Sequence, residues 1–308
     1  MAMRSEAQCP AGISSLFEIC KTNESGELLS DPLKIGARGG GFAILQGVRS
    51  RVLLRKSTSR RITVRINGIE SDAVTTRWAL KQLMAREALS LDLRVDLRIA
   101  VPIGAGYGTS AAGTAASLLA FADAMNLPIT LNEIGRMTHV AEVINNTGLG
   151  TASAMLVGGF DLVTEPGAPG VGVVDRLLFP RNCSIICTFL AATPTKDLLT
   201  QHDIDRRVNP AGRKAMKAIR HEPRLATFLN EARQFSLKAG FQTPEISRIM
   251  NLMMTEGAIG VAQNMVGRAV HGVAHLDLAP EIAKHLRREY PSARVFVTNL
   301  DNRGVRLV

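Results

Sequence analysis

The chain has 308 residues, of which 46% are hydrophobic, and a formal net charge of +10. This length accommodates one large or two ordinary domains, and the apolar content excludes a largely disordered chain. No uninterrupted apolar run is long enough to span a bilayer, and residues 1–12 lack the apolar core of a signal peptide. We therefore expect a cytoplasmic protein with two domains and without a membrane partner.

The four cysteines, Cys9, Cys20, Cys183 and Cys187, form no C-x-x-C pair. Neither a disulfide framework nor a zinc site is expected from them. The basic residues are spread along the chain, and aromatic residues make up only 4%. Because stacking platforms for nucleic acid are scarce, the charge favours a small anionic substrate such as ATP over a nucleic-acid partner.

The first third of the chain is dominated by strand-forming runs. Strands are predicted at residues 13–20, 49–55, 61–66 and 93–101. The second and third of these alternate apolar and charged residues, which suits a half-exposed antiparallel sheet, and an Asn67-Gly68 turn ends the third. Residues 72–89 have apolar positions at helical spacing, with Asp72 as the expected cap.

Helices and strands then alternate to the end of the chain. An alanine-rich helix is predicted at residues 109–125, and a second at 130–145 begins with the capping box Thr130-Leu-Asn-Glu133. A strand follows, and from Asp175 the character shifts to a mixture of both element types. The later elements are strands at 160–164, 183–191, 293–298 and 304–308, helices over 210–256, and a helix at 280–290. This order predicts an α+β protein with a second domain that closes over the first.

The stretch from Pro102 to Gly113, PIGAGYGTSAAG, carries the clearest chemical signal. Glycines alternate at positions 104, 106 and 108 and lead directly into the helix that starts at Thr109. Glycine permits positive φ, and the N–H groups and dipole of a first helical turn favour an anion, above all a phosphate. A plain strand-to-helix turn with a Ser or Thr cap is the alternative reading.

His139 and Glu142 lie one turn apart near the end of the second predicted helix and therefore share a face. Without further context, polar residues on an otherwise apolar helix are more often surface residues, so the spacing alone favours a solvated position for both. Another feature is needed to assign them a chemical role.

Sequence similarity to a known protein family supplies this feature. PIGAGYGTSAAG resembles the phosphate loop of the GHMP kinases, the superfamily of galactokinase, homoserine kinase and mevalonate kinase. Along nearly the whole chain, further stretches resemble one subfamily, the archaeal pantoate kinases: PAGISSLFEI, DPLKIGARGGG, HVAEVINNTGLG, TPTKDLL and AQNMVGRAVHGVA. The resemblance implies a GHMP kinase fold, usually dimeric. Its N-terminal domain (residues 1–180) would be ribosomal protein S5 domain 2-like and bind ATP, and its C-terminal domain (181–308) would be ferredoxin-like.

The resemblance also implies an activity, the ATP-dependent phosphorylation of pantoate to 4-phosphopantoate in coenzyme A biosynthesis. Ser110 and Glu142 would be catalytic and would bind Mg²⁺, and His139 and Thr195 would face pantoate. ATP would be bound by the loop and the start of its helix, that is by Pro102, Gly104, Gly106, Tyr107, Gly108, Thr109, Ser110 and Ala111.

The chain departs from the subfamily pattern on the acceptor side. Thr151 occupies the place of an aspartate, and Gly12, Ile35 and Ala37 occupy the places of a histidine and two serines. An arginine expected after Gly159 is absent as well. Phosphoryl transfer depends mainly on positioning and charge neutralisation, so it is feasible without that aspartate, and Asp161 is another candidate for its role.

Three alternatives remain open at this point. The chain could be a GHMP-type kinase for a different alcohol, a nucleotide-binding homologue without catalysis, or a basic nucleic-acid-binding module.

Overall fold

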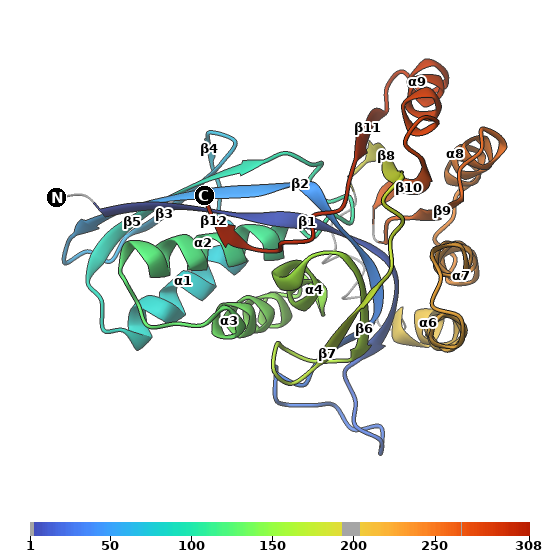
Figure 1. Ribbon diagram of the computed structural model, residues 1–308. Coiled ribbons are helices and arrows are strands. Elements are labelled where there is room, and N and C mark those ends of the chain that lie inside the picture. Colours follow the sequence, from blue (N-terminus) through green and yellow to red (C-terminus); the bar gives the residue numbers. More distant parts are fainter. Residues whose placement is uncertain (1–2, 193–203, 266) are drawn as a thin grey trace.

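The computed structural model describes residues 3–192, 204–265 and 267–308. Within these ranges the strands form two sheets (Figure 1). The larger has the order β12-β1-β2-β5-β3-β4, with β6 paired to β2 and β7 paired to β6. Its strands are β1 (Met3–Cys20), β2 (Gly36–Lys56), β3 (Ile62–Ile66), β4 (Ile69–Glu70), β5 (Leu91–Ile99), β6 (Phe160–Glu165), β7 (Val173–Leu177) and β12 (Arg306–Leu307).

β1 and β2 form a long antiparallel hairpin that runs through the whole molecule. Register shifts interrupt it between Pro10 and Ala11 and between Ser14 and Leu16. β1 is much longer than the strand predicted at residues 13–20. The prediction missed its first half because Pro10 and Gly12 disfavour a regular strand, whereas here they lie next to the first irregularity.

Three helices cover one face of the larger sheet: α1 (Val74–Arg86), α2 (Thr109–Ala124) and α3 (Leu131–Ile144) (Figure 1). The capping box predicted for α3 is confirmed, because Thr130 and Glu133 exchange hydrogen bonds. The cap predicted for α1 is wrong. Ala73 holds the N-cap position in a left-handed conformation, with no side-chain hydrogen bond, so Asp72 lies outside the helix.

The antiparallel sheet expected around the two basic strands is only partly observed: β2 is antiparallel to β1 and β5, whereas β3 is antiparallel to β4 but parallel to β5. β5 lies between β2 and β3, antiparallel to β2 and parallel to β3. The reason is topological, since α1 connects the β3–β4 hairpin to β5 and such a helical crossover joins parallel strands.

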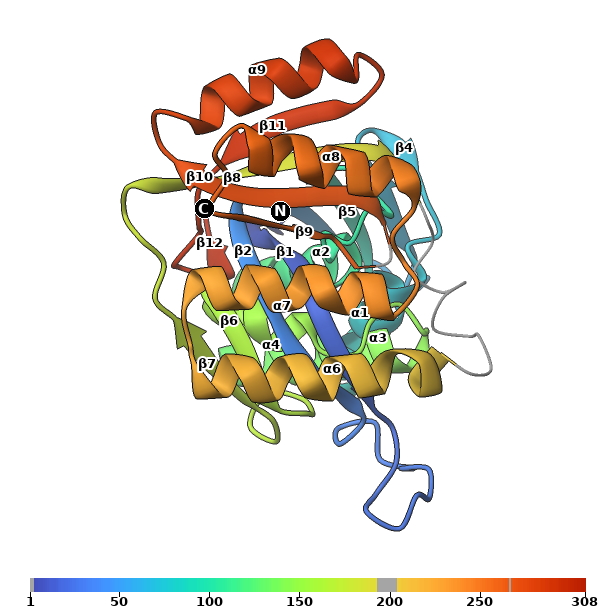
Figure 2. The ribbon, with the colours of Figure 1, turned by 90° about the vertical axis from the view of Figure 1, so that its right-hand side faces the viewer.

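The smaller sheet has the order β11-β8-β10-β9 and is antiparallel throughout. Its strands are β8 (Cys183–Ala191), β9 (Gly260–Gln263), β10 (Arg268–His275) and β11 (Arg294–Thr298), and the helices of this part are α6 (Ile204–His221), α7 (Leu225–Lys238), α8 (Pro244–Thr255) and α9 (Ala279–Glu289). α8 and α9 pack on this sheet through an apolar core of their own. α6 and α7 run side by side (Figure 2); α6 packs on the β1–β2 hairpin, and α7 also packs against β9 of the smaller sheet.

The two parts of the chain share one core. Phe42 of β2 stacks on Phe160 of β6 at 4.6 Å, and Phe228 of α7 meets the Phe160 ring edge-on at 4.7 Å. The predicted boundary at residue 180 falls between β7 and β8, but β12 returns to pair with β1. No described helix is both long and apolar enough to cross a membrane.

Candidate functional site

The glycine loop connects β5 to α2 and adopts the backbone conformation that its sequence indicates. Gly104, Gly106 and Gly108 have φ values of 71°, 72° and 59°, a region that other residues enter only at a cost. Gly108 is the N-cap of α2 and no side chain caps the helix. The N–H groups of the first turn are therefore available for an anion.

Backbone contacts hold this loop from two sides. Gly12 N donates to Tyr107 O at 3.0 Å, which ties the loop to β1. On the other side, a Cβ atom on Gly106 would lie 2.4 Å from Met265 O, so a side chain there has no room. The loop is thus a close-fitting element with little freedom to rearrange.

A buried polar network fixes the same loop from the C-terminal part. Asn264 Nδ2 donates to Ala105 O at 3.2 Å, so its Oδ1 accepts from His271 Nδ1 at 2.8 Å. This assigns the imidazole proton to Nδ1, and Nε2 then accepts from Ser15 Oγ at 2.9 Å. Burial lowers the pKa of His271 to about 3, so the ring is neutral and the network keeps one arrangement.

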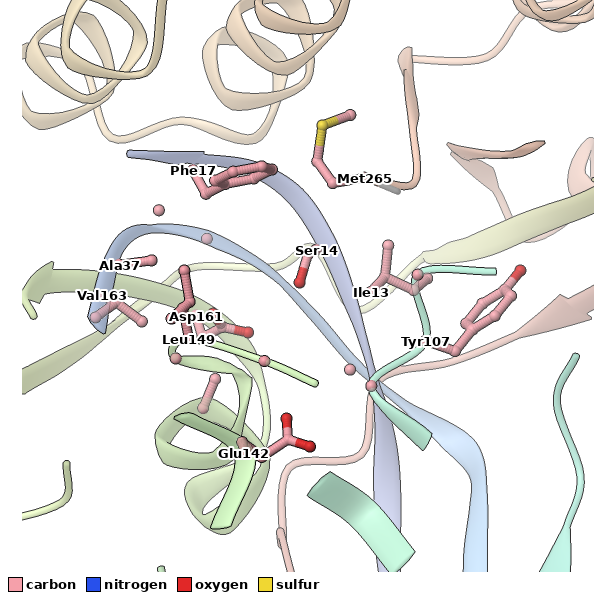
Figure 3. A pocket seen from close by; sticks show the side chains of 18 of the residues that line it. Ile13, Ser14, Phe17, Ala37, Tyr107, Glu142, Leu149, Asp161, Val163 and Met265 are labelled. Carbon is pink, nitrogen blue, oxygen red and sulfur yellow. The ribbon is translucent and has the colours of Figure 1, made fainter. Parts of the chain in front are cut away.

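The loop forms one wall of a cavity between β1, β2, β6 and the C-terminal end of α3 (Figure 3). Of the predicted ATP-binding residues, six line it: Gly104, Gly106, Tyr107, Gly108, Thr109 and Ser110. Pro102 and Ala111 are buried behind them and do not line it. The Tyr107 ring points away from the acidic side chains (Figure 3), is 1% exposed and packs near Phe296, so only its backbone can serve a phosphate.

Glu142 reaches the cavity from the last turn of α3 and is 3% exposed. Its carboxylate accepts hydrogen bonds from the hydroxyls of Ser110 and Thr147, the latter at 2.8 Å from Oε1. Burial raises the pKa of Glu142 despite these two donors. The structure therefore brings Ser110 and Glu142 together, and a cation beside them would compensate the buried charge.

Asp161 is a second buried carboxylate in this cavity (Figure 3). It lies on β6, is 5% exposed, and accepts hydrogen bonds from its own backbone N–H and that of Gly41. Sequence reasoning named it without placing it. The available signal was an aspartate inside the otherwise apolar strand FDLV, directly after two glycines.

His139 is also buried, at 1% exposure, so the surface reading of His139 and Glu142 is wrong. Its Nε2 atom lies 2.8 Å from Ile35 O, and the residue does not line the cavity. Burial lowers the pKa of His139, which favours the neutral ring that donates to this carbonyl. The ring thus fixes the segment that leads into β2, and its predicted contact with substrate stays a prediction.

The other acceptor-side positions are placed as follows. Gly12 and Ala37 line the cavity, Ile35 offers its carbonyl to His139, and Thr151 begins α4 (Thr151–Val157). Thr195 lies outside the described residues, as does the TPTKDLL stretch.

Arg38 is the basic side chain among the described residues that line the cavity. It forms ion pairs with Glu18 at 3.5 Å and Glu165 at 3.3 Å. Sequence reasoning did not single it out, because an arginine beside three glycines has no recognisable spacing.

Comparison with known proteins agrees with this geometry. Residues 73–160, which contain the loop and Glu142, match the family model of the GHMP kinases N terminal domain. The pantoate kinase of Thermococcus kodakarensis is 30% identical over 223 residues, which is 71% of this chain and 73% of that protein. The pantoate kinase of Methanocaldococcus jannaschii is 26% identical over 263 residues, which is 85% of this chain and 89% of that protein.

Among solved structures, one described as a phosphotransferase related to the CoA biosynthesis pathway has a TM-score of 0.86 and 24% identity. The match covers 100% of this chain and 99% of that one, so the two share a fold from end to end. The predicted α+β GHMP kinase fold is confirmed. Since the identity to an archaeal pantoate kinase extends over most of both chains, this protein belongs to the pantoate kinase family of the GHMP kinases.

Proposed function

We propose that this protein transfers the γ-phosphoryl group of ATP to the primary alcohol of pantoate, giving 4-phosphopantoate for coenzyme A biosynthesis. The observation that carries the proposal is the uncapped N-terminus of α2, which shares one cavity with Ser110 and Glu142. GHMP kinases use ATP, and the donors that a triphosphate needs are concentrated at this point.

The nucleotide phosphates would bind to the backbone N–H groups of the loop and of the first turn of α2. Because the network from Ser15 to Ala105 and the contacts of Gly106 hold the loop in place, these donors need little rearrangement when ATP binds. Preorganised donors stabilise developing charge most effectively.

The donor set beside the loop fits Mg²⁺. The ion prefers oxygen ligands and is commonly held by one or two carboxylates together with phosphates and water. Glu142 and Ser110 would supply the protein oxygens, since both line the cavity beside the loop. Bound there, Mg²⁺ would neutralise charge on the transferred phosphoryl group.

The far side of the cavity suits an acceptor with an apolar centre and an anionic end. Pantoate has two methyl groups on the carbon next to its primary alcohol, and a carboxylate. Apolar side chains would contact the methyl groups, namely Ile13, Leu16, Phe17, Leu149 and Val163, and Arg38 would attract the carboxylate. His139 and Thr195 remain predicted substrate-side residues. His139 would act indirectly, by fixing the Ile35 segment that leads into β2.

The test is ADP release by the purified protein with Mg-ATP and pantoate, run beside homoserine, mevalonate and a no-acceptor control. Release that depends on pantoate supports the proposal. Release with another alcohol only would keep the kinase and change its substrate, which the altered Gly12 and Ala37 positions make worth testing. ATP binding without release under any condition would favour a non-catalytic homologue.

The family resemblance also leads us to propose a homodimer in the cytoplasm. Light scattering coupled to size-exclusion chromatography tests the dimer directly, because it measures the molar mass and a monomer has a mass of 33.1 kDa.

A further inference from the structure

The placement of Asp161 follows from the alternation of β6. Phe160 and Leu162 are buried in the core that the sheet shares with α7, so the residues between and after them face the opposite side. Asp161 and Val163 accordingly both line the cavity. Figure 3 shows the Asp161 and Glu142 side chains directed into the same space.

The surroundings of Asp161 provide little to stabilise a buried charge. On β2, across the strand pair, lie Gly40 and Gly41, which have no side chains, and two backbone N–H groups are the hydrogen-bond donors to Asp161. On the other side, Arg176 of β7 is paired in register with Asp161, but its side chain is exposed and its guanidinium donates to Val157 O. The other charged side chains that line the described cavity are Glu142 of α3 and Arg38 of β2. Arg38 is engaged by Glu18 and Glu165, and Glu142 adds a like charge.

A buried carboxylate without a counter-ion costs stability, and burial raises the pKa of Asp161 to about 7. Groups of this kind are concentrated at functional sites, because a base works best when its pKa lies near the working pH. The other described acid in the cavity, Glu142, is already bonded to Ser110 and Thr147. Thr151, where the resemblance described above implies an aspartate, cannot accept a proton at neutral pH.

We propose that Asp161 is the catalytic base of this enzyme, in place of the residue replaced by Thr151. The inference rests on the proposed function. The Asp161 carboxylate takes the proton of the acceptor hydroxyl, the hydroxyl oxygen forms a bond to the γ-phosphorus, and the bond from that phosphorus to the β–γ bridging oxygen breaks. The products are the phosphate ester, ADP and a protonated Asp161, which then loses its proton to water.

The test is Asp161→Asn, which keeps shape and volume and removes the proton acceptor. Asp175→Asn is the matched control, because Asp175 is an exposed aspartate on the neighbouring strand β7. We expect kcat to fall by about 10²–10⁴-fold in Asp161→Asn, with KM for ATP within about threefold of wild type. In Asp175→Asn, kcat should stay within about twofold of wild type.

The pH profile distinguishes a base from a residue that only shapes the cavity. In the wild type kcat should rise with pH through an ionisation near neutrality, and in Asp161→Asn this rise should be absent. Full kcat in Asp161→Asn would overturn the proposal, as would a loss confined to KM for pantoate. If Asp161→Asn does not fold, as judged by its melting curve, Asp161→Ser serves for the same comparison.

These outcomes are separate from those of the proposed function. If the wild type releases no ADP with any acceptor, the proposed function fails and Asp161 has no hydroxyl to deprotonate. If the wild type is active and Asp161→Asn is equally active, the proposed function stands and the role of Asp161 is refuted.

Discussion

Gly148 packs directly against the carboxylate of Glu142. A Cβ atom on Gly148 would lie 2.0 Å from Glu142 Oε2, which no real structure tolerates. Thr147, the preceding residue, holds the other oxygen of the same carboxylate. The position of Glu142 is therefore set by two consecutive residues, one through a hydrogen bond and one through the lack of a side chain.

Gly148→Ala should consequently displace Glu142 and lower kcat by about 10²-fold, since an error of about 1 Å in a catalytic group has this effect. Steady-state kinetics at saturating Mg-ATP measure it. The control is the double variant with Glu142→Gln. If Gly148→Ala acts through Glu142, it should add little to the loss in Glu142→Gln, and fully multiplicative losses would contradict the explanation.

The raised pKa of Asp161 leads to a second prediction, which concerns stability rather than rate. Its pKa is raised from 3.8 to about 7 on folding, so the folded state binds more protons between these values. The contribution of Asp161 to the free energy of unfolding is therefore fully present below pH 3.8 and is lost as the pH rises to about 7. By this relation Asp161→Asn should stabilise the protein at pH 8, by an amount on the order of a few kcal/mol, and by less at pH 5.

Thermal melting of the wild type and Asp161→Asn at the two pH values tests this expectation. A variant that melts lower than the wild type at pH 8 would show that the carboxylate stabilises the fold. A gain in stability joined to a loss of rate is the signature expected of a residue kept for catalysis.

The phosphate loop depends on an element far from it in sequence, the turn between β9 and β10. Asn264 in that turn connects Ala105 O of the loop to the His271 ring of β10. Removing the amide leaves a buried carbonyl and a buried N–H without partners, at a cost of about 1–3 kcal/mol for each.

Asn264→Ala should therefore lower the melting temperature and raise the Kd for Mg-ATP, which calorimetric titration measures. Ser15→Ala is the comparison, because Ser15 bonds only the outer nitrogen of His271. We expect a smaller effect on ATP binding in Ser15→Ala. Equal effects in the two variants would show that the network supports the core without specifically holding the loop.

The sequence predicts these elements unevenly, for physical reasons. The loop, α2 and the Thr130 cap of α3 are local, since glycine conformation and capping depend on residues a few positions apart. The burial of Asp161 depends on Gly40 and Gly41, 120 positions earlier, and the pairing of β3 with β5 depends on the path of α1. No local pattern contains that information.

The C-terminal segment returns to the first strand of the chain, because β12 pairs with β1. Asp301, 2% exposed, accepts hydrogen bonds from the backbone of Arg303 and Gly304 and pairs with Arg306 at 2.8 Å. Its backbone also bonds Ala43 of β2 and Gly159 before β6. Together with the Phe42, Phe160 and Phe228 contacts, this segment should make both parts of the chain unfold as one unit.

Arg306→Ala should destabilise the whole protein by about 3 kcal/mol, because it leaves the buried Asp301 carboxylate without its charged partner. Arg303→Ala, which replaces an exposed arginine in the same segment, should change stability by no more than about 0.5 kcal/mol.

Urea unfolding followed by fluorescence of Trp78, the one tryptophan, reports on α1, whereas circular dichroism also reports on the C-terminal helices. In wild type and variant the two transitions should coincide, and Arg306→Ala should move both to lower urea. A fluorescence transition that shifts without the dichroism transition would show that the N-terminal part unfolds independently.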